Sequence, residues 1–147
     1  MKKTGIRAIM LPGTVFFVAA FYALLNAQSA APAQSVRDGI YTAAQAVRGE
    51  ALYDKHCERC HGDDLEGDEA PSLNSEDFLA DWKGMTVGDL FERIRIWMPG
   101  DRPGTLTRQE TADVLALVLR ANHFPPGLRE LGTDKQVLAG FRVENRH

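Results

Sequence analysis

The most specific chemical signal in this chain is a group of two cysteines and a histidine. Cys57, Cys60 and His61 occur in the order Cys-Glu-Arg-Cys-His. The C-x-x-C-H pattern is typical of covalent haem attachment, in which each thiol forms a thioether to one vinyl group of the same haem. The histidine that follows is placed under the iron, where its imidazole can ligate. The motif therefore predicts one covalently attached haem c, with its iron bound by His61.

Other uses of a cysteine pair fit the sequence less well. A thioredoxin-like redox pair is expected near a β-α-β pattern, and none is found. A zinc ribbon needs a second pair of cysteines, whereas this chain has two cysteines in all. A structural disulfide stays open as an alternative, although the adjacent histidine would then be a coincidence.

Met98 is the leading candidate for a second iron ligand. Apolar residues recur at helical spacing from Val87 to Ile94. This helix must end before Pro99, because a residue that precedes proline avoids the α conformation. Met98 then lies at the helix exit on the buried side, where its sulfur can be aimed at an iron. On spacing alone, three alternatives stay open: Met85, His123 and an open coordination position.

Capping patterns predict where the helices that position these residues begin. Thr42 with Gln45 opens a helix that runs to about His56 and delivers the cysteine motif. Ser75 is expected to cap a short helix through Ala80. Two further pairs are Thr86 with Asp89, and Thr107 with Glu110, the latter opening a closing helix that ends near Asn122. The segment 34–41 is expected to be a short polar lead-in to the first helix. The segment 138–143 is expected to be a short extended piece. The expected fold class is all-α.

Composition and charge limit the classes of partner. The 147 residues suffice for one domain, and the formal net charge of −3 gives no electrostatic support for binding nucleic acid. A loop rich in acidic residues and glycine follows His61, from Gly62 to Glu69. We interpret it as a solvated surface loop, with a docking surface for a basic partner as the alternative.

The first 33 residues are typical of a secretory signal peptide. Lys2, Lys3 and Arg7 precede a nearly uncharged apolar run over 8–25, and Ala31-Pro32-Ala33 fits a cleavage site. We favour cleavage over an uncleaved membrane anchor, because small residues crowd the end of the run. Cleavage would remove three positive charges and no negative ones. The mature domain would then span 34–147, with a C-terminal extension from about residue 122, and would be periplasmic. Contact with a membrane is expected only if the segment stays uncleaved.

The order of these parts resembles the class I monohaem cytochromes c over about residues 43–121. The shared order is a helix, Cys57–Gly62, Pro71-Ser72-Leu73, a second helix, Met98-Pro99 and a closing helix. Within this class, the chain is similar to the small periplasmic cytochromes that accompany bacterial quinoprotein dehydrogenases. The narrower similarity rests on Ala70–Leu73, Phe78-Leu79, Trp82, Thr86–Leu90, and Met98-Pro99 followed by Pro103–Leu106.

The resemblance implies a set of cofactor-binding residues and a fold: a small helical domain wrapped around one covalently attached haem. His61 would be the proximal ligand and Met98 the distal ligand. The carbonyl of Pro71 would hold the His61 ring, and the indole N–H of Trp82 would donate to a haem propionate.

The resemblance also implies that Gly49 and Tyr53 pack on the closing helix. That helix usually offers an aromatic residue to the contact, whereas the matching position here is Leu117. The expected lining of the haem pocket is apolar: Leu73, Phe78, Trp82, Leu90, Ile94, Met98 and Leu106.

The function implied by the resemblance is that of a periplasmic electron carrier rather than an enzyme. It would accept electrons from a dehydrogenase, with a quinoprotein as one candidate, and pass them to an oxidase or another cytochrome. The negative charge favours partners with basic docking patches. Two alternatives stay open: a haem enzyme or gas sensor with an open distal site, and a fixed cytochrome subunit of a dehydrogenase complex.

Overall fold

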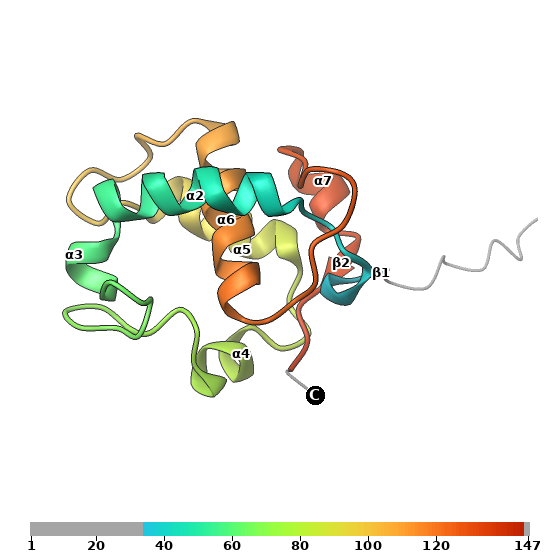
Figure 1. Cartoon of the computed structure of the whole chain (residues 1–147), viewed down its shortest axis with the longest axis horizontal. Helices are drawn as coiled ribbons and strands as arrows, with labels where there is room; N and C mark the ends of the chain where they lie inside the picture. Colours follow the sequence, from blue (N-terminus) through green and yellow to red (C-terminus); the bar gives the residue numbers. More distant parts are fainter. Residues whose placement is uncertain (1–33, 146–147) are drawn as a thin grey trace, which may run out of the picture. The chain divides into compact units, whose positions relative to one another are not determined.

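Two long helices that cross at a glycine form the centre of the fold. The computed structural model describes residues 34–145; the expected signal peptide, 1–33, lies outside these described residues. Helices α2 (Ala43–His56) and α6 (Arg108–Ala121) pack across each other (Figure 1). A Cβ atom on Gly49 would lie 1.9 Å from the carbonyl oxygen of Asp113. Only glycine allows this approach, so the expected packing of Gly49 on the closing helix is confirmed.

The helix starts predicted from capping residues are confirmed. Helices α4 (Glu76–Trp82), α5 (Val87–Trp97) and α6 are each preceded by a side-chain hydroxyl that accepts a hydrogen bond from a backbone N–H three residues on. Thr86 with Asp89 and Thr107 with Glu110 both form complete capping boxes. Helix α4 runs two residues beyond the predicted end at Ala80 and so includes Trp82.

The capping box predicted at Thr42 is wrong in one half. The Thr42 hydroxyl accepts a bond from the Gln45 N–H, at 3.1 Å, as expected. The Gln45 side chain, however, does not return to the cap. Its amide donates to the Leu131 carbonyl at 3.0 Å and accepts from the Leu131 N–H at 2.6 Å. Gln45 is fully buried, and a backbone that offers both a donor and an acceptor satisfies its amide better than the single N–H at the cap.

The segments on either side of the helical core are more ordered than the sequence suggested. Strand β1 (Gln34–Ser35) pairs in parallel with β2 (Phe141–Arg142), and a short 3₁₀ helix, η1 (Val36–Asp38), follows β1. The prediction of a polar lead-in is therefore wrong, because Val36, Ile40 and Tyr41 are buried in the core. The predicted extended piece over 138–143 is only partly right, because helix α7 (Lys135–Leu138) precedes β2.

Apolar side chains of α5 and α6 fill the core, and the expected stripe Val87, Leu90, Phe91 and Ile94 is buried. Among the described residues, no helix is long and apolar enough to cross a membrane. The expected helical fold class is confirmed: the described residues form a small, mostly helical domain, with one short two-stranded sheet as an addition.

Candidate haem site

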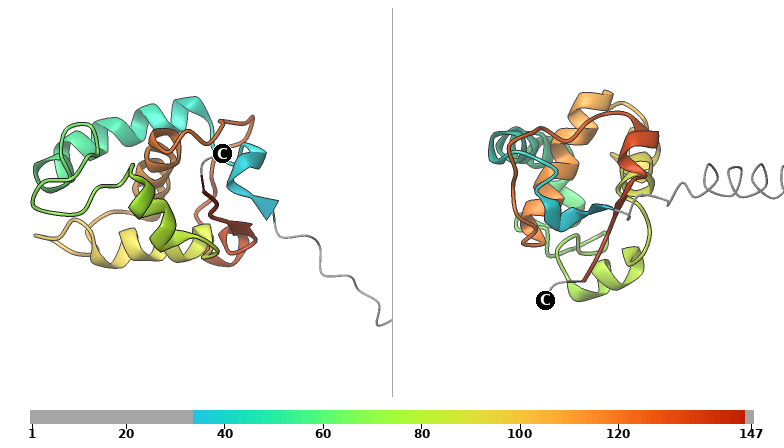
Figure 2. Two further views of the ribbon diagram at one scale, coloured as in Figure 1. Left: turned by 90° about the horizontal axis from the view of Figure 1, so that it is seen from below. Right: turned by 90° about the vertical axis from the view of Figure 1, so that its right-hand side faces the viewer.

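A large cavity lies between the end of α2, the short helix α3 (Glu58–His61), α4, α5 and the loop after α5. Its volume is about 1120 Å³, above the ~300–1,000 Å³ typical of small-molecule pockets. The left view of Figure 2 shows α2 and α3 above, and α4 and α5 below. All six residues expected to bind the cofactor line this cavity: Cys57, Cys60, His61, Pro71, Trp82 and Met98.

The cysteine motif forms a separate helical turn at the end of α2. Cys57 donates its N–H to the Tyr53 carbonyl at 2.7 Å, and its own carbonyl accepts from the N–H groups of Cys60 and His61 at 3.1 and 3.0 Å. This turn holds both half-buried thiols at the cavity wall. Burial, with a smaller contribution from Cys60, raises the pKa of the Cys57 thiol to about 11, so that the thiol is protonated at neutral pH.

The ring of His61 is held in the orientation that a metal ligand needs. Its Nδ1 lies 2.8 Å from the Pro71 carbonyl oxygen, which is the contact expected from the sequence. A carbonyl oxygen can only accept, so Nδ1 must carry the proton and donate it. The lone pair is then on Nε2, the nitrogen left free to bind iron. The residues present therefore fit a haem whose iron is bound from this side.

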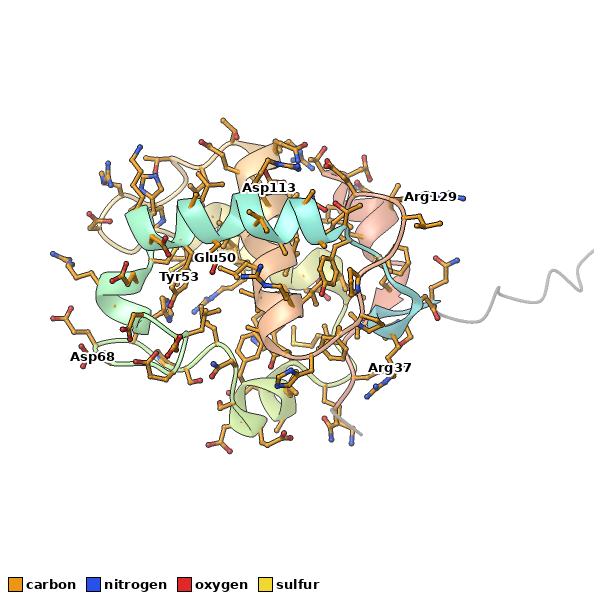
Figure 3. All side chains as sticks on the ribbon, in the orientation of Figure 1. Arg37, Glu50, Tyr53, Asp68, Asp113 and Arg129 are labelled. Carbon is orange, nitrogen blue, oxygen red and sulfur yellow. The ribbon has the colours of Figure 1, made fainter. Side chains whose placement is uncertain are left out.

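A hydrogen bond that the sequence did not reveal supports the same turn. The Tyr53 hydroxyl donates to the carbonyl of Gly62, directly after His61, at 2.6 Å. Figure 3 shows Tyr53 on α2, next to α3. Burial raises the pKa of this phenol, helped by Cys57 and neighbouring acidic residues, so that the hydroxyl keeps its proton and remains a donor. A tyrosine one helical turn before the first cysteine is visible in the sequence, but its partner is not.

Met98 lies at the helix exit, as the sequence predicted. Its N–H donates to the Ile94 carbonyl at 2.9 Å, and its carbonyl accepts from the Gly104 N–H at 3.3 Å, so both sides of the residue are held. Met85, the rival thioether, also lines the cavity and is 43% exposed. His123, the third candidate, lies in the turn after α6 and does not line the cavity. Two methionines are thus the candidates on the distal side.

The expected pocket lining is mostly confirmed. Leu73, Phe78, Trp82, Leu90, Ile94 and Met98 line the cavity, and the rings of Phe78 and Trp82 lie 6.3 Å apart. The prediction that Leu106 lines the pocket is wrong, because Leu106 is buried in the core and does not border the cavity. The sequence reading missed several residues that α5 and α6 contribute to the cavity wall: Arg93, Ile96, Trp97, Val114 and Val118.

The helical fold and the cavity walled by the C-x-x-C-H turn define a c-type cytochrome domain, a class that binds haem c with iron and transfers electrons. A family model described as cytochrome c oxidase, cbb3-type, subunit III, matches residues 44–118, and the chain belongs to this family. It is also similar to a chain in the crystal structure of the sulfane dehydrogenase SoxCD from Paracoccus pantotrophus, with 23% identity and a TM-score of 0.44. That match covers 83% of this chain and 60% of the other, so this chain spans less than two thirds of its length. No curated protein sequence matches.

Proposed function

We propose that this chain is a periplasmic electron carrier with one covalently attached haem c, bound through Cys57 and Cys60. The axial ligands of the iron would be His61 and Met98. The observation that carries this proposal is the hydrogen bond from His61 Nδ1 to the Pro71 carbonyl. It leaves Nε2 free to bind iron, and His61 and Met98 line the same cavity.

The bound haem would supply a one-electron couple between ferric and ferrous iron. The chain would set the position and the potential of this couple. A thioether ligand raises the potential of haem iron. Apolar side chains such as Leu90, Ile94 and Val118 exclude water and disfavour the more highly charged ferric state. With both axial positions filled by the protein, small molecules would have little access to the iron.

The proposed donor is a periplasmic dehydrogenase, with a quinoprotein enzyme as one candidate, and the proposed acceptor is an oxidase or another cytochrome. This rests on the similarity of segments such as Ala70–Leu73 and Thr86–Leu90 to periplasmic cytochromes that accompany such dehydrogenases. Export is proposed from the N-terminal 33 residues and from the haem motif, since haem c is attached outside the cytoplasm. Periplasmic fractionation and N-terminal sequencing of the purified protein would test export and cleavage.

The first test is an optical spectrum of the purified protein, oxidised and reduced, with and without carbon monoxide. A low-spin c-type spectrum that is indifferent to carbon monoxide, with a weak long-wavelength band from sulfur to ferric iron, is expected. A high-spin spectrum that responds to carbon monoxide would instead support a haem enzyme or a gas sensor, and Met98 would be a packing residue.

Two matched variants identify the sulfur ligand. Met98→Ala should remove the long-wavelength band, lower the midpoint potential and allow carbon monoxide to bind the ferrous iron. Met85→Ala should leave all three unchanged, although Met85 lines the same cavity. If the effects are exchanged between the two variants, Met85 is the ligand and the assignment of Met98 is wrong.

A further inference from the structure

The last turn of α5 places an unusually exposed indole directly before Met98. Trp97 is 58% exposed, which is uncommon for so large an apolar side chain. Leu90, Ile94 and Trp97 are spaced along one side of the helix, and all three line the haem cavity. The exposed surface of Trp97 therefore includes the part that borders the cavity.

Arg93 holds this indole from one helical turn earlier. Its guanidinium carbon lies 5.7 Å from the centre of the Trp97 ring, within the range of a cation–π contact. Arg93 also lines the cavity, and within residues 34–145 it forms no ion pair. The neighbouring Arg95, in contrast, is paired with Glu92 through two hydrogen bonds of 2.9 and 2.8 Å. Arg93 thus brings to the cavity wall a guanidinium that no described carboxylate pairs directly.

We propose that Trp97 is a cofactor-contacting residue and Arg93 a positioning residue: the indole covers the haem on the Met98 side, and Arg93 clamps the indole and adds a fixed positive charge. This inference rests on the proposed function, because it requires haem in the cavity. A bound haem would cover the cavity-facing part of the indole and remove apolar surface from water on both partners.

Two consequences follow for the iron. The indole excludes water and small ligands from the side on which Met98 binds. The charge of Arg93 disfavours the ferric state, which carries one more positive charge than the ferrous state, so that both residues raise the midpoint potential. The pair would therefore adjust a property of the carrier that the two axial ligands alone do not determine.

The role of Trp97 is tested by the binding of imidazole to the ferric protein. Trp97→Ala should bind imidazole several-fold faster than wild type and have a lower midpoint potential. Trp97→Phe, which keeps an aromatic cover, should stay close to wild type and serves as a second variant if the alanine variant folds poorly. Contacts between the Trp97 ring protons and haem protons, measured as nuclear Overhauser effects in the ferrous protein, should be present.

The role of Arg93 is tested by its charge. Arg93→Gln should lower the midpoint potential at low ionic strength. Arg93→Lys keeps the positive charge, so its midpoint potential should stay close to that of wild type. Arg129→Gln is the matched control: Arg129 is exposed and lies at the end of the domain opposite α3 (Figure 3). The same charge is removed there, away from the cavity, so little change in potential is expected.

Two results would overturn the inference. One is wild-type imidazole binding and potential in Trp97→Ala, together with no proton contacts between Trp97 and haem, which would place the indole in solvent. The other is equal potentials in Arg93→Gln and Arg129→Gln. Both results count against the inference only if the wild-type protein has a His–Met spectrum. A wild-type protein without that spectrum would refute the proposed function instead.

Discussion

At the scale of single residues, the hydroxyl of Tyr53 links α2 to the turn that carries Cys57, Cys60 and His61. Tyr53→Phe removes the 2.6 Å bond to the Gly62 carbonyl and leaves this carbonyl only a longer bond of 3.4 Å from the Leu65 N–H. We expect a loss of about 1–2 kcal/mol in the free energy of unfolding, measured with urea. Tyr41→Phe is the matched control, because it loses a bond of 2.7 Å to the Phe124 carbonyl. It should cost a similar amount, while only Tyr53→Phe alters the haem spectrum.

The same two phenols give the stability a dependence on alkaline pH. Burial raises the pKa of Tyr41 and of Tyr53 in the folded protein, whereas in the unfolded chain both ionise near pH 10. Their contribution is complete below about pH 10 and is lost as the pH rises toward the folded pKa values, because the unfolded state releases protons first. Unfolding free energies measured from pH 9 to 11 should fall, and fall less in Tyr53→Phe. An equal slope in that variant would contradict the assignment.

Some roles of single residues could be predicted from the sequence and others could not. Cys57, Cys60 and His61 form a local pattern with one dominant chemical meaning, and a helix that must end before Pro99 placed Met98. The Tyr53–Gly62 contact and the place of Trp97 depend on how the chain turns after α2 and on the direction in which α5 faces. Leu106 was misplaced for the same reason: its apolar character predicts burial but not which cavity it borders.

At the scale of elements, the crossing of α2 and α6 depends on one missing side chain. Gly49→Ala would put a methyl group 1.9 Å from a backbone oxygen, so one helix would have to move. We expect a loss of about 2–4 kcal/mol in the free energy of unfolding, measured by thermal or urea denaturation. Gly132→Ala is the control, because a Cβ there meets no atom within 4 Å. A similar loss in both variants would show that the close approach is not the cause.

The C-terminal extension is held to the core by the buried amide of Gln45. Gln45→Met keeps the approximate volume but leaves the N–H and carbonyl of Leu131 without partners. The penalty for such buried groups is about 1–3 kcal/mol each. We expect faster amide exchange over residues 122–145, with Gln136→Met, an exposed position in α7, as control. Unchanged exchange in Gln45→Met would mean that other contacts hold the extension.

The elements also differ in how well the sequence predicts them. Helix starts follow from hydroxyl and carboxyl side chains three residues apart, a local signal that held for α5 and α6. The β1–β2 pair and the Gln45–Leu131 contact both join residues that lie far apart in the sequence; Gln45 and Leu131 are 86 positions apart. No local pattern encodes such pairings, because each partner's sequence is compatible with many others.

At the scale of the whole molecule, charge should govern how the haem meets other redox centres. The net charge is −3, and cleavage of the expected signal peptide would remove three positive charges. Oxidation of the ferrous protein by the tris(phenanthroline)cobalt(III) cation should slow as salt is added, and oxidation by the hexacyanoferrate(III) anion should accelerate. Stopped-flow rates across a range of salt concentrations measure both. The opposite pair of slopes would show that the local charge at the cavity mouth outweighs the net charge.

The parallel pairing of β1 with β2 brings residue 34 beside residue 141. Figure 1 shows this pair on the side of the domain away from α3. The start of the described chain and the last strand are therefore side by side, remote from the cysteine turn, and the chain continues only a short way beyond β2 to residue 145. A tether or a fused module could be attached at the N-terminal or at the C-terminal end without covering the redox centre. A circular permutant that links the two ends and opens the chain in an exposed loop should be a tolerated rearrangement of this domain.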